Sequence, residues 1–466
     1  MISLMIFSII ATGLAGLILK FVFDLTKNHN NITWKEYLIG ILVISIALVP
    51  SVTAIGWKIA KSNNLSFNEY WNGWEKEAVW TVIPCSRDGP CRNTYSCDPY
   101  VVMVPYTVCD SKNNCTTQYR AETRYHNCPY ANEEWTFGVD TTLGFYSIDS
   151  YRFPENPQAH RWRSYEPIPQ YAINRAGSGF PTFWSAVKAR LDAGKPGPVT
   201  KRMTYQNYLL ASDQTILKQY SSEIERFNAL KLLPPVKSNI VDMYYADKAQ
   251  FIGYTPKDAG DWQRNLMYFN AALGMELQGD LHLVIVQNET ISANPDAYLL
   301  ALKAYWHNKD VFGDDAISKN SIIVVVGTKN GDSVAWVRAV TGMPLGNEQM
   351  IVAIRNFPWE NVPLTPDAVI GTVNGEFYTA AQDDGSKKIK IRGVHNGGAL
   401  ERIIWGLDKP QTKFNRVSMK DFNYLSGEIE PTGKQKFWIL FVTFLVCLPV
   451  WLVFIAVGER TWRKTP

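Results

Sequence analysis

Three long apolar segments divide this chain of 466 residues into two short ends and one large polar body. Residues 2–23, 37–57 and 437–457 are almost free of charged side chains, and Lys20 is an exception in the first segment. A helix needs about 20 apolar residues to cross the hydrocarbon core of a membrane. The pattern therefore predicts three transmembrane helices, two of them within residues 1–57. A signal peptide is the weaker alternative for the first segment, which lacks a basic start and is closely followed by the second.

Between the second and third segments the pattern of polar and apolar positions changes three times. Residues 58–165 carry short strand-like runs separated by glycine turns and are interpreted as a Cys-rich β module. Residues 166–235 combine extended Pro-rich sequence with helical spacing, which predicts a helical and extended connector. Residues 236–408 alternate apolar runs with helical segments, which predicts an α/β domain. Residues 409–436 then act as a linker, and residues 458–466 form a C-terminal tail.

Within the β module, residues 101–109 and 115–128 are predicted to pair as strands around a short loop, and residues 135–148 continue the β pattern. These strands mix tyrosine, valine and threonine with charged residues. They offer little apolar side chain for a core of their own, so we expect covalent support.

In the α/β domain, the wholly apolar runs 281–286 and 321–326 predict buried strands, because a strand covered on both faces does not alternate. The segment that begins with Thr255 and Pro256 predicts a helix through about Leu277, with Thr255 as the cap. Together these elements indicate a sheet with helices on both faces.

Six of the seven cysteines lie between residues 85 and 128. An even, dense cluster in a domain outside the membrane is typical of a disulfide framework. The spacing of Cys85 from Cys91, and of Cys109 from Cys115, suits two local bridges, but the pairing stays open. Zinc is an alternative because His126 lies near Cys128, although no CxxC pair is present, and free thiols are a third. The cluster comprises Cys85, Cys91, Cys97, Cys109, Cys115 and Cys128. The seventh, Cys447, falls in the third apolar segment.

Basic residues outside the apolar segments predict the orientation in the membrane. Lys27 and Lys35 lie between the first two spans, and Arg460, Arg463 and Lys464 lie in the tail. Both regions are expected on the cytoplasmic side, which places the N-terminus and the main body on the extracytoplasmic side, the periplasm if the host is bacterial with the protein in its inner membrane. The lysines that flank the body weigh against this only weakly, because large domains translocate largely regardless of charge.

Composition narrows the class of partner. Aromatic residues make up 13% of the chain, with 16 Trp and 23 Tyr, which suits membrane interfaces and flat contact surfaces. The net charge of +4, without a basic run interleaved with aromatics, argues against nucleic acid. A mean hydropathy of −0.15 excludes a polytopic transporter. The partners expected are membrane lipid, further copies of the chain and other membrane proteins.

One stretch carries an order of features found in a known family. The run LHLVIVQNET leads to a helix ending near Trp306, and the polar loop KDVFGDDAISKN precedes SIIVVVGTKNGD. AWVRAVTGMPLG then supplies a strand that ends in a Thr-Gly turn. In this order, residues 250–375 resemble a TPM domain.

The resemblance implies an α/β sandwich, in a family whose members are often tethered to a membrane and face the extracytoplasmic side. Some members have been proposed to bind divalent cations or to act as acid phosphatases, and others support the assembly of membrane proteins. The expected fold class is therefore an α+β membrane protein, with three transmembrane helices, a disulfide-rich β module and a TPM-like α/β sandwich outside the membrane.

Carried over by position, the resemblance implies a cation site at Asp314, Asp315 and Asp332, with Asp310 nearby. A hard cation such as Ca²⁺ or Mg²⁺ needs several oxygen ligands, which carboxylates supply. Lys319 and Lys329 depart from the pattern and would weaken such a site. The alternative is that Asp314 and Asp315 are a solvated loop or a helix cap.

Motifs of well-known enzymes are missing from the sequence. It contains no P-loop, no GxGxxG, no HExxH and no GxSxG motif. His282 lies inside an apolar run and is interpreted as a packed or paired residue rather than a ligand. His395 precedes a short helix, where Gly397 and Gly398 suit an ordinary loop-to-helix turn or, alternatively, the approach of an anion.

The favoured hypothesis is a non-enzymatic assembly, scaffold or binding protein, anchored in a membrane and forming a homo-oligomer through its outside body. Tyrosine and tryptophan are enriched at the cores of interfaces, and no catalytic constellation is evident. The alternative is a divalent-cation-dependent, membrane-anchored phosphatase or other hydrolase that uses the three aspartates. A channel is the least favoured, because the spans carry no polar stripe.

Overall fold

The structure is a computed structural model that describes eleven stretches of the chain. They are residues 1–25, 32–92, 94–109, 115–129, 133–149, 182–212, 220–236, 248–317, 319–342, 345–381 and 387–457. The predictions for Lys27 and for the tail 458–466 fall outside these residues, as does most of the Pro-rich sequence around residue 166.

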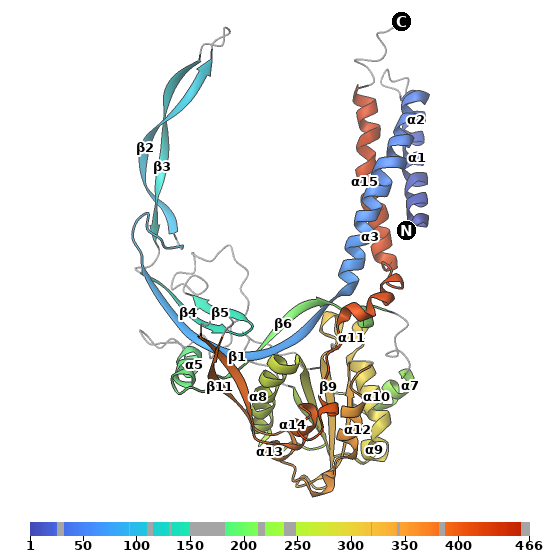
Figure 1. The fold of residues 1–466 in the computed structure, drawn as a ribbon. Coiled ribbons are helices and arrows are strands. Elements are labelled where there is room, and N and C mark those ends of the chain that lie inside the picture. The colour runs from blue at the N-terminus through green and yellow to red at the C-terminus, as the bar shows by residue number, and fades with distance from the viewer. Residues whose placement is uncertain are drawn as a thin grey trace.

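Three helical rods are long and apolar enough to cross a membrane, in agreement with the three predicted spans. They are α1 (Ile2–Leu25), the continuous run of α2 (Trp34–Val43), η1 (Ile44–Leu48) and α3 (Val49–Leu65), and α15 (Gly433–Val457). Figure 1 shows them side by side above the body. Helix α3 continues about two turns past the predicted end of the second span.

The three rods pack around Trp451 of α15, which is fully buried. Its indole Nε1 donates to the carbonyl oxygen of Thr12 at 3.1 Å, and its ring stacks on Tyr37 with centroids 5.4 Å apart. A Cβ at Gly16 would lie 2.5 Å from the indole, so only glycine leaves room for it. Small residues at such crossings let apolar helices approach closely.

Strand β1 (Ser66–Pro84) begins directly after α3 and continues for 19 residues. Its first half pairs antiparallel with β6 (Pro198–Gln206), and its second half pairs antiparallel with β4 (Glu133–Thr141). Strand β5 (Gly144–Asp149) completes the sheet in the order β5-β4-β1-β6. Because β6 falls within residues 166–235, the predicted connector supplies a strand to the β module. Figure 1 shows β1 curving from the foot of α3 to the root of a long hairpin.

That hairpin consists of β2 (Thr94–Cys109) and β3 (Cys115–Pro129), paired antiparallel from Thr94 opposite Pro129 to Cys109 opposite Cys115. The two predicted strands are therefore confirmed, with β2 longer than expected. We call residues 94–129 the arm. Figure 1 shows that the arm leaves the body and extends on the same side as the three long helices.

The α/β domain is built on a second four-stranded sheet in the order β10-β9-β8-β7. Strands β7 (Ala249–Ile252), β8 (Asp280–Val286) and β9 (Ser321–Thr328) are parallel, and β10 (Val334–Thr341) is antiparallel to β9. The predicted strands at 281–286 and 321–326 are confirmed. Side chains of β8 alternate between two apolar clusters, one on each face of the sheet.

Helices α8 (Ala259–Leu277) and α10 (Pro295–Trp306) supply the principal cover of the two faces. Helix α8 begins four residues after the predicted cap Thr255, because Pro256 lies in a turn whose carbonyl oxygen accepts from the Ala259 N–H. The other elements are short and lie around these two sheets. They are α5 (Thr182–Asp192), α6 (Tyr208–Ala211), α7 (Ser221–Ala229), α9 (Glu289–Ala293), α11 (Lys309–Phe312), η4 (Gly313–Asp315), α12 (Glu348–Asn356), η5 (Trp359–Asn361), α13 (Pro366–Val369), β11 (Val373–Ala381), β12 (Lys387–His395), α14 (Ala399–Ile404), η6 (Pro410–Thr412) and η7 (Met419–Gly427).

Buried polar side chains of β1 join the two sheets. Asn72 donates from Nδ2 to Asp280 at 2.9 Å, and Lys248 also binds this carboxylate. All three side chains are buried. Burial alone would raise the pKa of Asp280, but the adjacent Lys248 ammonium and His282 hold it well below its ordinary value. Removing one partner from such a buried pair leaves an uncompensated charge, so the contact fixes β1 on the α/β domain.

A second polar cluster closes the far end of β12. His395 lies between two carboxylates, with Nδ1 2.6 Å from Glu401 and Nε2 3.5 Å from Glu276 of α8. Burial would lower the pKa of His395, but the hydrogen bonds with Glu276 and Glu401 raise it to about 9. The pKa of Glu276 is lowered below 4.5 despite its partial burial, because His395 and Trp405 hydrogen-bond to it.

These two shifts predict how stability depends on pH. A raised folded-state pKa means that the contribution of His395 is complete below pH 6.5 and is lost as the pH rises through about 9. The lowered pKa of Glu276 means that its contribution declines only as the pH falls below 4.5. We therefore expect the contribution of His395 to the free energy of unfolding, taken as the difference between the wild type and His395→Gln, to fall by about 1–3 kcal/mol between pH 6.5 and pH 9, measured by urea unfolding in a neutral detergent.

The variant His395→Gln should flatten this decline, because it removes the titrating group. His126→Gln, in the arm and outside the α/β domain, is the matched control and should keep the wild-type slope. A His395→Gln protein that still loses stability as steeply as the wild type would show that this cluster is not the source.

Candidate functional site

The arm contributes no side chain to the two apolar clusters that cover the α/β sheet. Strand β2 has 16 residues, and at a rise of about 3.3 Å per residue the arm is about 50 Å long. This is comparable to a membrane with its headgroups, about 40–45 Å. Most of its side chains are exposed, including Val101 at 67% and Tyr119 at 62%.

Three disulfides lie in and beside the arm. Cys109–Cys115 closes its tip, Cys97–Cys128 joins its two strands near the base, and Cys85–Cys91 closes the loop that leads into it. The disulfide framework is therefore confirmed, including both bridges suggested by spacing. The third pair, Cys97–Cys128, was left open by the sequence, and it crosses the hairpin diagonally, because Cys97 lies opposite His126 and Cys128 lies opposite Tyr95.

Covalent bonds are needed because a two-stranded hairpin is marginally stable in water. A hairpin with two exposed faces also specifies its register weakly, and a slip by one residue exchanges the faces. Bridges at the tip and near the base prevent such a slip along the whole arm. The arm therefore presents two defined faces.

Along the described strands, from Pro99 opposite Tyr125 to Val108 opposite Thr116, one face of the arm carries no charged side chain, whereas the other does. On the uncharged face, cross-strand pairs are formed by Pro99, Val101, Met103, Pro105 and Thr107 of β2 with Tyr125, Thr123, Ala121, Tyr119 and Thr117 of β3. On the polar face, the pairs are formed by Tyr100, Val102, Val104, Tyr106 and Val108 with Arg124, Glu122, Arg120, Gln118 and Thr116. Uncharged and charged positions alternate at every second residue, which is typical of a strand pair whose two faces have different surroundings.

The two edges of the arm also differ. Strand β2 contains Pro99 and Pro105, which have no N–H and weaken its outer edge as a template for another strand. Strand β3 contains no proline between Cys115 and Cys128. The β3 edge is therefore the better surface for the backbone of a neighbour.

The root of the arm is held by Asp88. Its backbone N–H donates to the Asn127 carbonyl at 2.8 Å, and its carboxylate accepts from the Asn127 N–H at 2.8 Å. These hydrogen bonds and that with His126 hold the pKa of Asp88 below its ordinary value. The loop closed by Cys85 and Cys91 is thereby fixed to β3, which orients the arm where it leaves β1.

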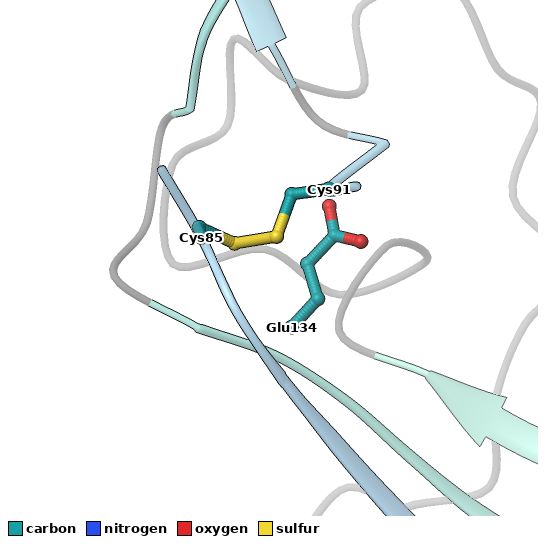
Figure 2. Close-up of side chains that lie close together, drawn as sticks. All are labelled: Cys85, Cys91 and Glu134. Carbon is teal, nitrogen blue, oxygen red and sulfur yellow. A yellow bond between two sulfur atoms is a disulfide. The ribbon is translucent and has the colours of Figure 1, made fainter. Parts of the chain in front are cut away.

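Zinc has no thiolate ligand in this oxidised arrangement. Figure 2 shows Cys85 and Cys91 joined by their sulfur atoms, with the Glu134 carboxylate beside them. Potential ligand atoms of these three residues lie within 4.8 Å of one another, and Cys97, Asp98 and Cys128 form a second, separate group of this kind. Zinc requires deprotonated thiols, and the disulfides remove them. Glu134 instead accepts from the Arg92 backbone N–H at 2.8 Å.

The predicted aspartates do not form one site. Asp315 precedes β9, whereas Asp332 follows it, so a strand of eight residues, about 26 Å, separates their positions. The Asp315 carboxylate accepts from Asn68 at 2.9 Å and lies 3.6 Å from Arg202. Asp310 is exposed at the start of α11, and the side chain of Asp314 is outside the described part of the structure.

The two histidines singled out from the sequence are both paired. His282 is buried and its Nε2 lies 2.8 Å from Asp280, as expected of a packed residue. The Gly397 and Gly398 N–H groups donate to Glu401, at 2.8 and 3.1 Å. The chain's own carboxylate thus takes the donors that an anion would need, and the loop-to-helix interpretation of His395 holds.

Comparison of the chain with family models, with curated proteins and with solved structures finds no significant match. The TPM resemblance of residues 250–375 therefore stays a prediction, and function has to be argued from the geometry.

The two bridges of the arm should protect it independently of the body. Replacing Cys109 and Cys115 with serine should let the tip open, and replacing Cys97 and Cys128 should loosen the base. We expect trypsin to cleave after Arg120 and Arg124 about tenfold faster or more in either double variant, because removing a bridge costs about 2–5 kcal/mol locally.

The unfolding of the α/β domain serves as the internal control in this experiment, because these four cysteines lie on β2 and β3, which form a sheet separate from that of the α/β domain. Its urea midpoint should not change. Cleavage at the wild-type rate in both double variants would mean that strand pairing alone maintains the arm.

Proposed function

We propose that this protein is a membrane-anchored assembly protein that forms a homo-oligomer on the extracytoplasmic side, with the arm as the principal contact. The observation that carries the proposal is the arm itself, a long hairpin with an uncharged exposed face and bridges at both ends. Exposed tyrosine and methionine on a rigid surface are typical of the centre of a protein interface. These side chains belong to neither apolar cluster of the α/β sheet.

A second copy of the chain is the partner favoured by the position of the arm. The arm extends on the same side of the body as the long helices (Figure 1). An open strand edge presents backbone N–H and C=O groups that can pair with a strand of a neighbouring chain. Copies anchored in one membrane hold their arms at the same height, and this confinement raises their effective concentration. The β3 edge, free of internal proline, is the surface offered.

The orientation of the chain is part of the proposal. Disulfides persist in oxidising compartments, which supports an extracytoplasmic body, the periplasm in a bacterial host. The positions of Lys35 and of the basic tail support cytoplasmic placement of those segments. The α/β layering supports, by analogy with the TPM resemblance, a role in the assembly of membrane proteins rather than in chemistry.

The hydrolase alternative receives no comparable support. It needs Asp315 and Asp332 at one cation, and the two lie at opposite ends of β9. The Asp315 carboxylate is already occupied by Asn68 and Arg202.

Photo-cross-linking from the arm tests the proposal. The residue p-benzoylphenylalanine, placed at Tyr119 on the uncharged face, should give a cross-linked dimer on irradiation of the protein in its membrane. The same residue at Phe145 of β5 is the matched control, because this aromatic side chain is also exposed, at 51%, but lies in the body sheet. Tyr119 should give several times more dimer than Phe145.

A charge placed on each face makes the test specific. Met103→Glu should abolish cross-linking from Tyr119, because it buries a carboxylate in the proposed contact. Val104→Glu, on the polar face opposite Arg120, should leave it unchanged. Equal yields from Tyr119 and Phe145, or a Met103→Glu protein that still cross-links fully, would contradict the proposal.

A further inference from the structure

A cavity of about 1250 Å³ lies where the membrane-proximal half of β1 meets the α/β domain. Its walls are β1 and β6, the last turns of α8, and residues 416–423. Small-molecule sites usually measure about 300–1000 Å³, so the cavity is far larger than an inorganic anion requires. The arm takes no part in it.

The lining combines positive charge with apolar surface. Three basic residues line the cavity, namely Lys319, Arg416 and Lys420, and none of its described lining residues is Asp or Glu. Much of the remaining wall is aromatic or sulfur-containing. It includes Trp71, Met203 and Met275, of which Trp71 and Met275 are 41% and 42% exposed. Methionine adapts its shape to flexible apolar ligands.

Lys319 is the cation held most deeply in this cavity, at 4% exposure. Its Nζ donates to the carbonyl oxygen of Val417 at 2.8 Å, which is a neutral acceptor. Burial and the neighbouring Arg416 lower the pKa of Lys319 to about 8, although Glu69 and Asp421 act in the opposite direction. An anion in the cavity would relieve this cost by pairing with Nζ.

Arg416 is held in position by a buried carboxylate that uses only part of its hydrogen-bonding capacity. Glu69 of β1 is fully buried and accepts two hydrogen bonds from Arg416 Nη2, at 2.9 and 2.8 Å, and one from Trp71 Nε1 at 3.1 Å. This arrangement places the guanidinium in the wall with a set orientation. Arginine held in this way retains donors for a phosphate oxygen.

The segment that forms one wall of the cavity is hydrogen-bonded to the long helices. Helix η7 contributes Met419 and Lys420 to the wall, and its Ser426 carbonyl accepts from Lys61, near the end of α3. Asn64 of α3 donates to the Glu430 carbonyl at 3.0 Å, just before α15 begins. These bonds attach one wall of the cavity to the ends of α3 and α15, the ends at which both helices enter the body.

We propose that this cavity binds an anionic phospholipid of the adjacent leaflet, with its phosphate at Lys319, Arg416 and Lys420 and the start of an acyl chain against Trp71 and Met275. The site would select lipids by charge and couple the body to the membrane surface. It does not depend on the proposed role of the arm.

Titration of the full chain in a neutral detergent with water-soluble lipids tests this site. Dihexanoyl-phosphatidylglycerol, dihexanoyl-phosphatidylcholine and inorganic phosphate are compared by isothermal titration calorimetry. The phosphatidylglycerol should bind at least about tenfold more tightly than either of the others, because it alone offers both net negative charge and apolar chains. Equal binding of the two lipids, or of phosphate and phosphatidylglycerol, would overturn the proposal.

Variants at the exposed part of the lining keep the test independent of folding. Lys420→Gln should weaken phosphatidylglycerol binding about threefold to tenfold, and Met275→Glu about tenfold or more through repulsion of the phosphate and loss of apolar contact. Lys409→Gln, an exposed lysine of the neighbouring segment outside the lining, is the matched control and should bind like the wild type. Wild-type binding in both Lys420→Gln and Met275→Glu would place the lipid elsewhere and overturn the proposal.

Discussion

Buried polar pairs along β1 hold the parts of this protein together. Glu69 and Glu75 are fully buried on this strand, and each is bound by an arginine from a distant part of the chain, Arg416 and Arg190. Asn72 between them binds Asp280 of the α/β sheet. A buried carboxylate without its partner is strongly destabilising, so these pairs allow only one position of β1 on the α/β domain. The same strand continues from α3 and leads to the arm, and its position therefore sets the directions of α3 and of the arm.

The fixed position of β1 determines where the arm and the cavity lie. The arm is fixed by disulfides and by Asp88 at its root, and it extends on the same side of the body as the three long helices (Figure 1). The cavity lies behind Glu69, where β1 leaves α3, and is lined by cations without carboxylates among its described lining residues. The arm and the cavity are surfaces that the apolar clusters of the α/β sheet leave uncovered. One suits a neighbouring copy and the other suits a charged lipid.

Local patterns predicted the local structure. Apolar length predicted the three long helices, and wholly apolar runs predicted β8 and β9. Short spacing suggested the Cys85–Cys91 and Cys109–Cys115 bridges without fixing the pairing. Contacts between distant residues left no such pattern. Strand β6 has too few apolar residues to be distinguished from a connector, and the pairing of Glu69 with Arg416 spans most of the chain. The acidic residues Asp315 and Asp332 look equivalent in the sequence, yet β9 separates them.

Assembly through the arm is the central claim, and the mass of the native particle tests it most directly. The full chain is extracted in a neutral detergent without reductant and measured by native mass spectrometry. The account predicts a single defined multiple of the 52.8 kDa chain, which reverts to a monomer when the uncharged face carries Met103→Glu. A wild-type particle that is monomeric across the accessible concentration range would contradict it.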